Sequence, residues 1–170
     1  TDAGVKTVAL LTNMQVPLGR TAGNALEVRE SVEVLAGGGP ADVVELTVRL
    51  AEEMLEAAGR GGQDVGAALQ DGRAMDAWRR MIAAQGGDPD ATLPVAKETH
   101  VVTAPTSGVL TQLDAYAVGI AAWRLGAGRA RKEDPVQAGA GVEWHAVVGD
   151  RVEAGQPVMT PHPDTPERAA

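Results

Sequence analysis

The chain has 170 residues, enough for one ordinary domain or for a small domain with part of another. With 44% hydrophobic and 22% charged residues, it is not an intrinsically disordered sequence. The formal net charge of −8 argues against nucleic-acid and membrane partners, and the lack of cysteine excludes disulfides and thiolate zinc sites. No apolar run approaches the roughly 20 residues of a membrane span, and no signal-like segment is present, so we expect a cytoplasmic protein.

The first half of the chain has mostly helical patterning. Residues 5–12 form a short apolar run that is typical of a buried strand in an α/β sheet, and a loop with Pro17 and Gly19 follows. Apolar spacing and capping residues predict four helices, over residues 22–35, 40–58, 65–69 and 74–85, and Asp64 is placed to cap the third of them. The second of these is apolar on more than one face, which predicts a helix covered on two sides.

From residue 99 onward the pattern changes to short strands. We expect these over residues 99–104, 109–113, 141–147 and 156–160. Asp114 is placed to cap a helix over 115–125, which Gly126 ends. The sequence therefore predicts an α/β (α+β) chain with a boundary near residue 98, between a mostly helical part (1–98) and a small β-rich module (99–165).

Residues 147–158 have the pattern of a tight hairpin. Gly149 and Asp150 predict the turn, Val152 is expected to point inward, and Gly155 leads into the next strand. The hairpin is similar to those of biotinyl and lipoyl carrier domains. Those carriers need an exposed lysine at a hairpin tip, and no lysine of the module has that context. We therefore expect a barrel-sandwich-like module without the carrier function.

The sequence contains no short catalytic motif such as GxSxG, HExxH or a Walker A loop. The three histidines, His100, His145 and His162, lie far apart in sequence and are expected to be structural. The glutamates at helical spacing are expected to form solvated helix faces. The cations within residues 126–132 follow a helix end, so we expect them to complement its negative dipole rather than to bind an anion.

A longer pattern lies in the N-terminal third. Residues 11–30, LTNMQVPLGRTAGNALEVRE, resemble the T-D-M-x-Q-P-L-G-x-x-x-G-N-A-L-E-V-x-E segment of thymidine and pyrimidine-nucleoside phosphorylases. The resemblance continues at GGGPAD (37–42), MIAAQGG (81–87), LGAGR with KED (125–134) and the hairpin at 149–157. It covers nearly the whole chain, and the G-N-A-L-E-V-x-E run is far more specific than a four-residue motif.

The resemblance implies a pentosyltransferase of nucleoside salvage. Such enzymes reversibly cleave thymidine with phosphate to thymine and 2-deoxyribose 1-phosphate, and they are usually homodimers with a small helical domain, a large α/β domain and a C-terminal β module. The family's K-H-S phosphate loop, its S-G-R signature and its pyrimidine-binding Arg and Lys do not occur in this sequence. We therefore expect a C-terminal portion that contains no catalytic or substrate-binding residue and is inactive alone.

One site of the family reaches into this portion. The resemblance implies a potassium ion held by the backbone carbonyls of Leu18 and Thr21 and by the side chain of Glu30. Hard cations prefer oxygen ligands, and a Pro-Gly loop exposes carbonyls that a helix would use internally. The alternative is that Glu30 is one more surface carboxylate of its helix.

Two other functions stay open at this point. The chain could be a non-catalytic binding or regulatory module that retains the phosphorylase C-terminal fold. It could also be a biotinyl-like carrier, against which the missing exposed lysine argues. The residues that would distinguish thymidine from uridine are not in this sequence.

Overall fold

The computed structural model describes residues 4–163, 165 and 168. They group into two compact units that interleave along the chain. We call Thr1–Asn13 with Val32–Asp90 the helical unit, and Met14–Ser31 with Ala91–Ala170 the sheet unit. The domain boundary near residue 98 stays a prediction. The two units are groups of contacting residues within one chain, and such a grouping does not test where a domain begins. None of the helices in the described part of the chain is long and apolar enough to cross a membrane.

The helical unit holds the end of α1 (Asn24–Leu35) and the helices α2 (Ala41–Ala57), α3 (Val65–Gln70) and α4 (Arg73–Ala84). These four helices match the predicted ones within one or two residues at most ends. Pro40 occupies the N-cap of α2 with φ −66°, the value to which its ring restricts it. The local signals of the sequence therefore sufficed to define the helices of this unit.

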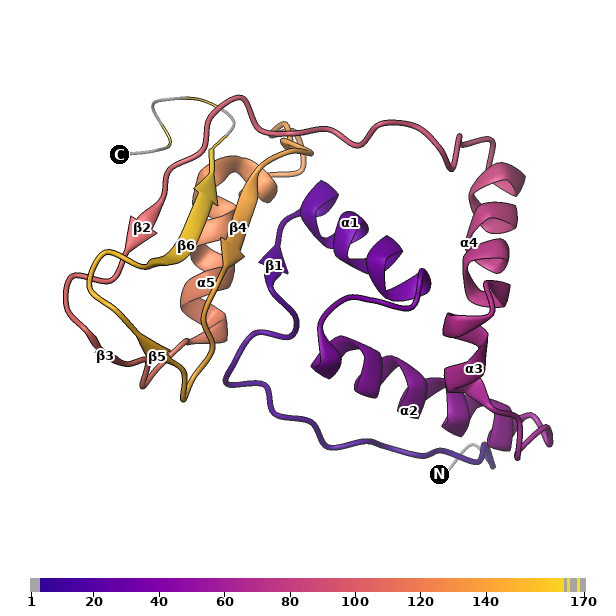
Figure 1. The fold of residues 1–170 in the computed structure, drawn as a ribbon. Helices are drawn as coiled ribbons and strands as arrows, with labels where there is room; N and C mark the ends of the chain where they lie inside the picture. The colour runs from indigo at the N-terminus through magenta and orange to yellow at the C-terminus, as the bar shows by residue number, and fades with distance from the viewer. Residues whose placement is uncertain (1–3, 164, 166–167, 169–170) are drawn as a thin grey trace. The chain divides into compact units, whose positions relative to one another are not determined.

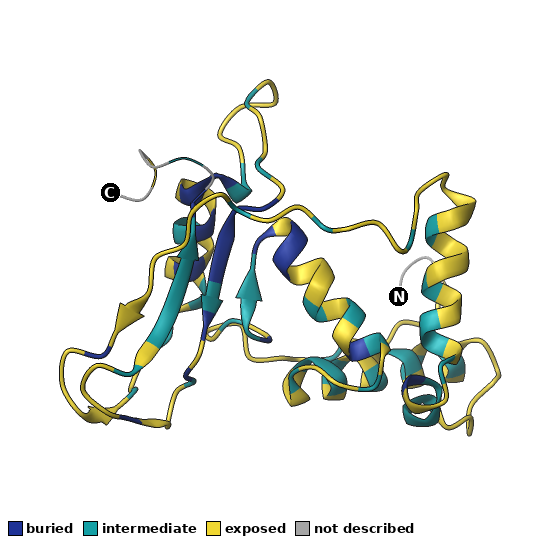
Figure 2. Ribbon diagram, turned by 45° about the horizontal axis from the view of Figure 1, so that its top comes forward, coloured by how far each residue is buried: buried dark blue, intermediate teal, exposed yellow. Residues whose placement is uncertain are grey.

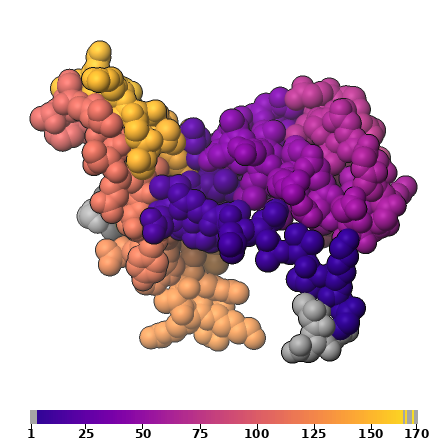
Figure 3. Space-filling model, turned by 90° about the horizontal axis from the view of Figure 1, so that it is seen from below, coloured from indigo at the N-terminus to yellow at the C-terminus, as the bar shows by residue number. Residues whose placement is uncertain are grey.

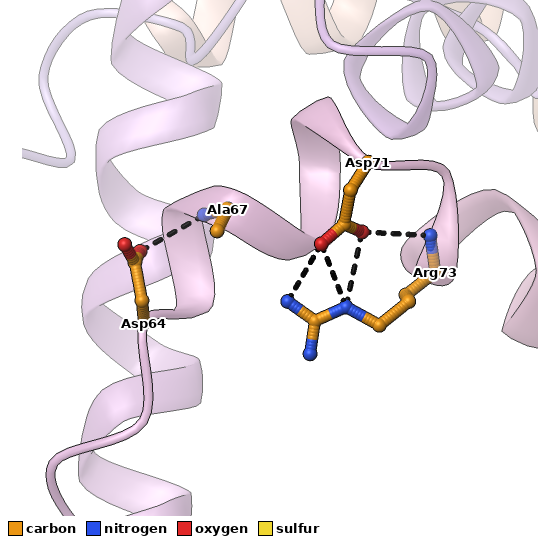
Figure 4. Close-up of polar contacts among 4 residues, drawn as sticks. All are labelled: Asp64, Ala67, Asp71 and Arg73. Atoms are coloured by element: carbon orange, nitrogen blue, oxygen red, sulfur yellow. Dashed lines mark hydrogen bonds and ion pairs between the residues drawn. The ribbon is translucent and has the colours of Figure 1, made fainter.

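Two aspartates fix the ends of the short helix α3. The Asp64 carboxylate accepts the Ala67 N–H at 2.9 Å, which confirms the predicted cap (Figure 4). After α3, the Asp71 carboxylate binds both the N–H and the guanidinium of Arg73 at the start of α4. The Arg73 N–H is the main cause of an Asp71 pKa below the usual range, and the guanidinium adds to it.

The helical unit buries little apolar surface. No residue of α2 or α4 is buried, and Figure 2 shows neither helix in dark blue. Among the described residues of this unit, the buried apolar side chains are Val34 and Leu69. The prediction that α2 is covered on two sides is thus wrong for this chain, because α3 packs against α2 and leaves its apolar residues at most half-buried.

The predicted strand over residues 5–12 is also wrong. This segment forms no strand in the structure and runs as an extended, exposed trace (Figure 1). Val5 is 63% exposed and Leu11 is fully exposed. A strand needs a neighbour for its backbone hydrogen bonds, and no described strand pairs with this segment.

The sheet unit contains two antiparallel sheets (Figure 1). The larger has the order β1-β4-β6-β2, formed by Thr21–Ala22, Gly141–Trp144, Pro157–His162 and Val102–Thr103. The smaller pairs β3 (Gly108–Val109) with β5 (Arg151–Val152). The α+β class is confirmed, whereas the barrel-sandwich arrangement is not confirmed by these two sheets.

One helix supplies the core of the sheet unit. The helix α5 (Ala115–Ala122) continues into a π-helical turn, η1 (Trp123–Ala127). Asp114 caps α5 by accepting the Ala117 N–H at 2.7 Å, as predicted. Val118, Ala122 and Leu125 pack against Val142 and Trp144 of β4, which are 0% and 2% exposed.

The hairpin before β5 has the predicted turn. Gly149 adopts φ +100°, which favours glycine, and the Asp150 carboxylate accepts the Val147 N–H at 2.8 Å. Val152 then points inward and packs with Ala104 and Ala146 in a second small core. The inward orientation of Val152 is therefore confirmed.

Candidate functional site

The three predicted cation ligands lie in the sheet unit, around the junction between the Pro17–Gly19 loop and α1. Gly19 is buried with φ +74°, which reverses the chain directly after Leu18. Arg20, the two residues of β1 and Gly23 follow, and α1 begins at Asn24. The loop is thus held between the edge of a sheet and the start of a helix.

Glu30 reaches back from α1 to this loop. Its Oε1 accepts the backbone N–H of Arg20 at 2.8 Å, ten residues earlier in the chain, and the residue is half-buried. Arg20 lies next to Thr21 and two residues after Leu18, so this hydrogen bond brings the Glu30 carboxylate to the segment that carries both proposed carbonyl ligands.

A second carboxylate of α1 has a similar role. Glu27 Oε1 accepts the backbone N–H of Gly23 at 2.9 Å, at the residue that precedes the helix. The expectation that the glutamates of this helix form a solvated face is therefore wrong for the half-buried Glu30, whereas Glu27 is exposed as expected. Both side chains bind backbone N–H groups of the preceding segment, which a sequence periodicity cannot reveal.

The register of β1 determines where the Thr21 carbonyl points. The Trp144 N–H donates to the Arg20 carbonyl at 2.9 Å, so Arg20 and Trp144 form a hydrogen-bonded pair. Residue pairs alternate in an antiparallel ladder, which makes Thr21 and Glu143 a non-hydrogen-bonded pair. Because β1 is an edge strand, the Thr21 carbonyl points away from the sheet and is not used by the ladder.

The donor set at this loop suits a hard cation rather than a transition metal. Within the described residues, no three His, Cys, Asp or Glu side chains are grouped closely enough to hold a metal ion. A cation bound here would therefore depend mainly on backbone oxygens, with Glu30 supplying the negative charge. Such a ligand set is typical of group I and II cations.

The histidines lie on the sheet and contact its neighbouring strands. His145 Nε2 is 2.7 Å from Thr160 Oγ1, and His162 Nε2 is 3.7 Å from Glu143 Oε2. Burial lowers the pKa of His162 below 6.5, and the nearby Glu143 carboxylate opposes that shift. These contacts join β4 to β6, in keeping with the structural role expected of His145 and His162. The Glu143–His162 pair follows from the strand register, which the sequence alone did not provide.

Comparison with known proteins gives one consistent result. Residues 109–170 match the pyrimidine nucleoside phosphorylase C-terminal domain. The chain is 58% identical over 165 residues to a thymidine phosphorylase of Mycobacterium tuberculosis. The aligned region covers 97% of this chain and 39% of the relative.

More distant relatives agree. A pyrimidine-nucleoside phosphorylase of Bacillus subtilis is 36% identical over 94% of this chain, and one of Staphylococcus haemolyticus is 35% identical over 95%. The chain covers 39% and 40% of these relatives, so it spans about two fifths of the length of the curated proteins it matches. Residues 109–170 thus belong to the pyrimidine nucleoside phosphorylase C-terminal domain family, and over nearly its whole length the chain is similar to the C-terminal portion of thymidine and pyrimidine-nucleoside phosphorylases.

Proposed function

We propose that this chain serves as the C-terminal portion of a pyrimidine-nucleoside phosphorylase. The complete protein would cleave thymidine reversibly with phosphate, giving thymine and 2-deoxyribose 1-phosphate. The observation that carries this proposal is the 58% identity to a relative named thymidine phosphorylase, which extends over 97% of the chain. We further propose that the complete protein is a cytoplasmic homodimer, as the family resemblance implies.

The reaction defines what the rest of the protein must supply. A phosphate oxygen forms a bond to the anomeric carbon, the glycosidic C–N bond breaks, and its electron pair leaves with the pyrimidine, which then takes up a proton. The protein must bind the phosphate dianion and stabilise the departing base. We assign neither task to residues of this chain, whose contribution is to position other groups.

The positioning role centres on the loop before α1. Glu30 would fix the backbone of this loop through the Arg20 N–H, at 2.8 Å, and so hold the neighbouring carbonyls in one arrangement. We propose that Leu18, Thr21 and Glu30 hold a potassium ion, which would supply a fixed positive charge at the loop. The outward Thr21 carbonyl and the Glu30–Arg20 contact support this assignment.

The proposed function is tested by comparing two proteins in one assay. Phosphate-dependent release of thymine from thymidine is measured for the 170-residue chain and for the protein encoded by the complete reading frame that contains it. We expect activity from the complete protein and none from the chain alone. An inactive complete protein with intact folding would contradict the proposal and favour a non-catalytic module that retained the fold.

A further inference from the structure

A cavity of about 360 Å³ opens beside η1, within the sheet unit. Three of its lining side chains are arginines, Arg124, Arg129 and Arg168, and one is an aspartate, Asp134. The side chain of Trp123 also lines it, and this residue is 40% exposed. The described lining thus has a surplus of two positive charges, on a chain whose formal charge is −8.

The end of η1 does not account for these cations. The carbonyl of Gly126 accepts a hydrogen bond from the Gln137 N–H at 2.9 Å. The carbonyl of Ala127 accepts one from Asn24 Nδ2, also at 2.9 Å. Other groups therefore satisfy these two carbonyls at the end of the helix, which leaves the arginine side chains available for another role.

The aspartate at the cavity does not neutralise the arginines either. Asp134 Oδ2 accepts the Arg131 N–H at 2.9 Å, and the Asp134 N–H donates to the Arg131 carbonyl at 3.1 Å, which closes a turn. Arg129 donates to the Lys132 carbonyl at 3.0 Å, which holds its guanidinium across the same loop. No guanidinium that lines the cavity forms an ion pair with a described carboxylate.

Two glycines allow side chains that line the cavity to lie close to the backbone. Gly126 has φ +116°, and a Cβ at this position would stand 3.3 Å from Arg168 Nη1. A Cβ on Gly128 would stand 2.9 Å from Trp123 Cδ1. The missing side chains therefore let the arginine and the indole lie directly against the backbone. The segment that follows η1, in light orange in Figure 3, protrudes from the surface.

We propose that this cavity binds a small phosphate-bearing anion, with Arg124, Arg129 and Arg168 as the donors. Guanidinium groups form paired, charge-assisted hydrogen bonds with phosphate oxygens. The exposed face of Trp123 offers a surface on which an organic group attached to the phosphate can stack. A long polyanion is disfavoured, since the net charge of −8 would repel it beyond the cavity.

The test is a titration of the 15N-labelled 170-residue chain followed by NMR. The probes are inorganic phosphate, ribose 5-phosphate, uridine 5′-monophosphate and uncharged uridine. We expect the three phosphate compounds to shift the Nε–Hε signals of Arg124, Arg129 and Arg168, and uridine to leave them unchanged. Tighter binding of uridine monophosphate, lost in Trp123→Ala, would identify a nucleotide, whereas equal binding of all three would identify phosphate itself as the recognised group.

Variants make the result specific to the cavity. Arg129→Gln and Arg168→Gln should each weaken binding roughly tenfold, because each removes one charge-assisted donor. The matched control is Arg151→Gln, which removes an equal charge from an exposed position of β5 and should bind normally. The proposal is overturned if phosphate shifts none of the three arginine signals, or if the control weakens binding as much. Binding of an oligonucleotide alone would likewise overturn it. The readout is binding, so the outcome is separate from that of the phosphorolysis assay.

Discussion

The two units of this chain bury very different amounts of apolar surface. In the sheet unit, α5 and η1 pack on β4 around Val142 and Trp144, which are almost fully buried. In the helical unit, Met54 and Met81 are 66% and 50% exposed, although their helices are well formed. Capping and spacing therefore suffice to specify helices, whereas burial needs a partner element. We expect the exposed helix faces to be covered in the complete protein, since the chain spans about two fifths of its relatives.

The largest expected effect breaks the core of the sheet unit. Trp144→Ala removes a side chain that is 2% exposed and should lower the free energy of unfolding by about 3–5 kcal/mol. The matched control, Trp78→Ala, lies on α4, where no residue is buried, and should cost less than about 1 kcal/mol. Urea unfolding is followed through amide signals of the unit that carries each substitution, β6 for Trp144→Ala and α4 for Trp78→Ala. Equal costs would mean that the two units do not differ as described.

A smaller effect tests the second core at the hairpin. Val152→Asp places a carboxylate beside Ala104 and Ala146 in an apolar core. It should lower the free energy of unfolding by roughly 2–4 kcal/mol, because the side chains of this core cannot form hydrogen bonds with the carboxylate. Val109→Asp is the control on the paired strand β3, since Val109 is 47% exposed and should tolerate the charge. The melting temperatures of the two variants give the comparison. An unchanged melting temperature for Val152→Asp would contradict the inward orientation.

The smallest effect concerns pH and is confined to the sheet unit. Burial holds the pKa of His162 below 6.5, so the unfolded chain binds this proton more readily than the folded one. The free energy of unfolding of the sheet unit should therefore have its full value above about pH 6.5 and decrease as the pH falls below that value. His162→Gln should remove this part of the pH dependence, measured as unfolding midpoints between neutral and mildly acidic pH. An unchanged slope in this variant would mean that His162 is not the group responsible for it.

The features predicted from sequence are those that depend on neighbouring residues. The caps at Asp64 and Asp114 and the turn at Gly149 were predicted because a few adjacent residues determine each of them. The failures all involve contacts between distant segments. Residues 5–12 were expected to be a buried strand, but a strand exists only where another one pairs with it.

The candidate sites show the same division. The resemblance supplied Leu18, Thr21 and Glu30, but the hydrogen bond from Arg20 to Glu30 and the edge position of β1 appear only in three dimensions. Arg168 joins the cavity beside η1 from more than forty residues further along the chain, so no local pattern could include it. The chemistry of these side chains is evident from the sequence, but the contacts between distant segments that bring them together could not be predicted.

The role proposed for Glu30 is to support a phosphorylase by holding the loop before α1 around a cation. Its most direct test is the potassium dependence of phosphorolysis by the complete protein carrying Glu30→Gln. Glutamine can still accept the Arg20 N–H but has lost the charge, so half-maximal activity should require more potassium and full activity should return at high potassium. Glu33→Gln, an exposed carboxylate of the same helix, should behave as the unmodified protein. Loss of activity at every potassium concentration, together with one limb of the pH profile, would instead make Glu30 a proton carrier and contradict the account.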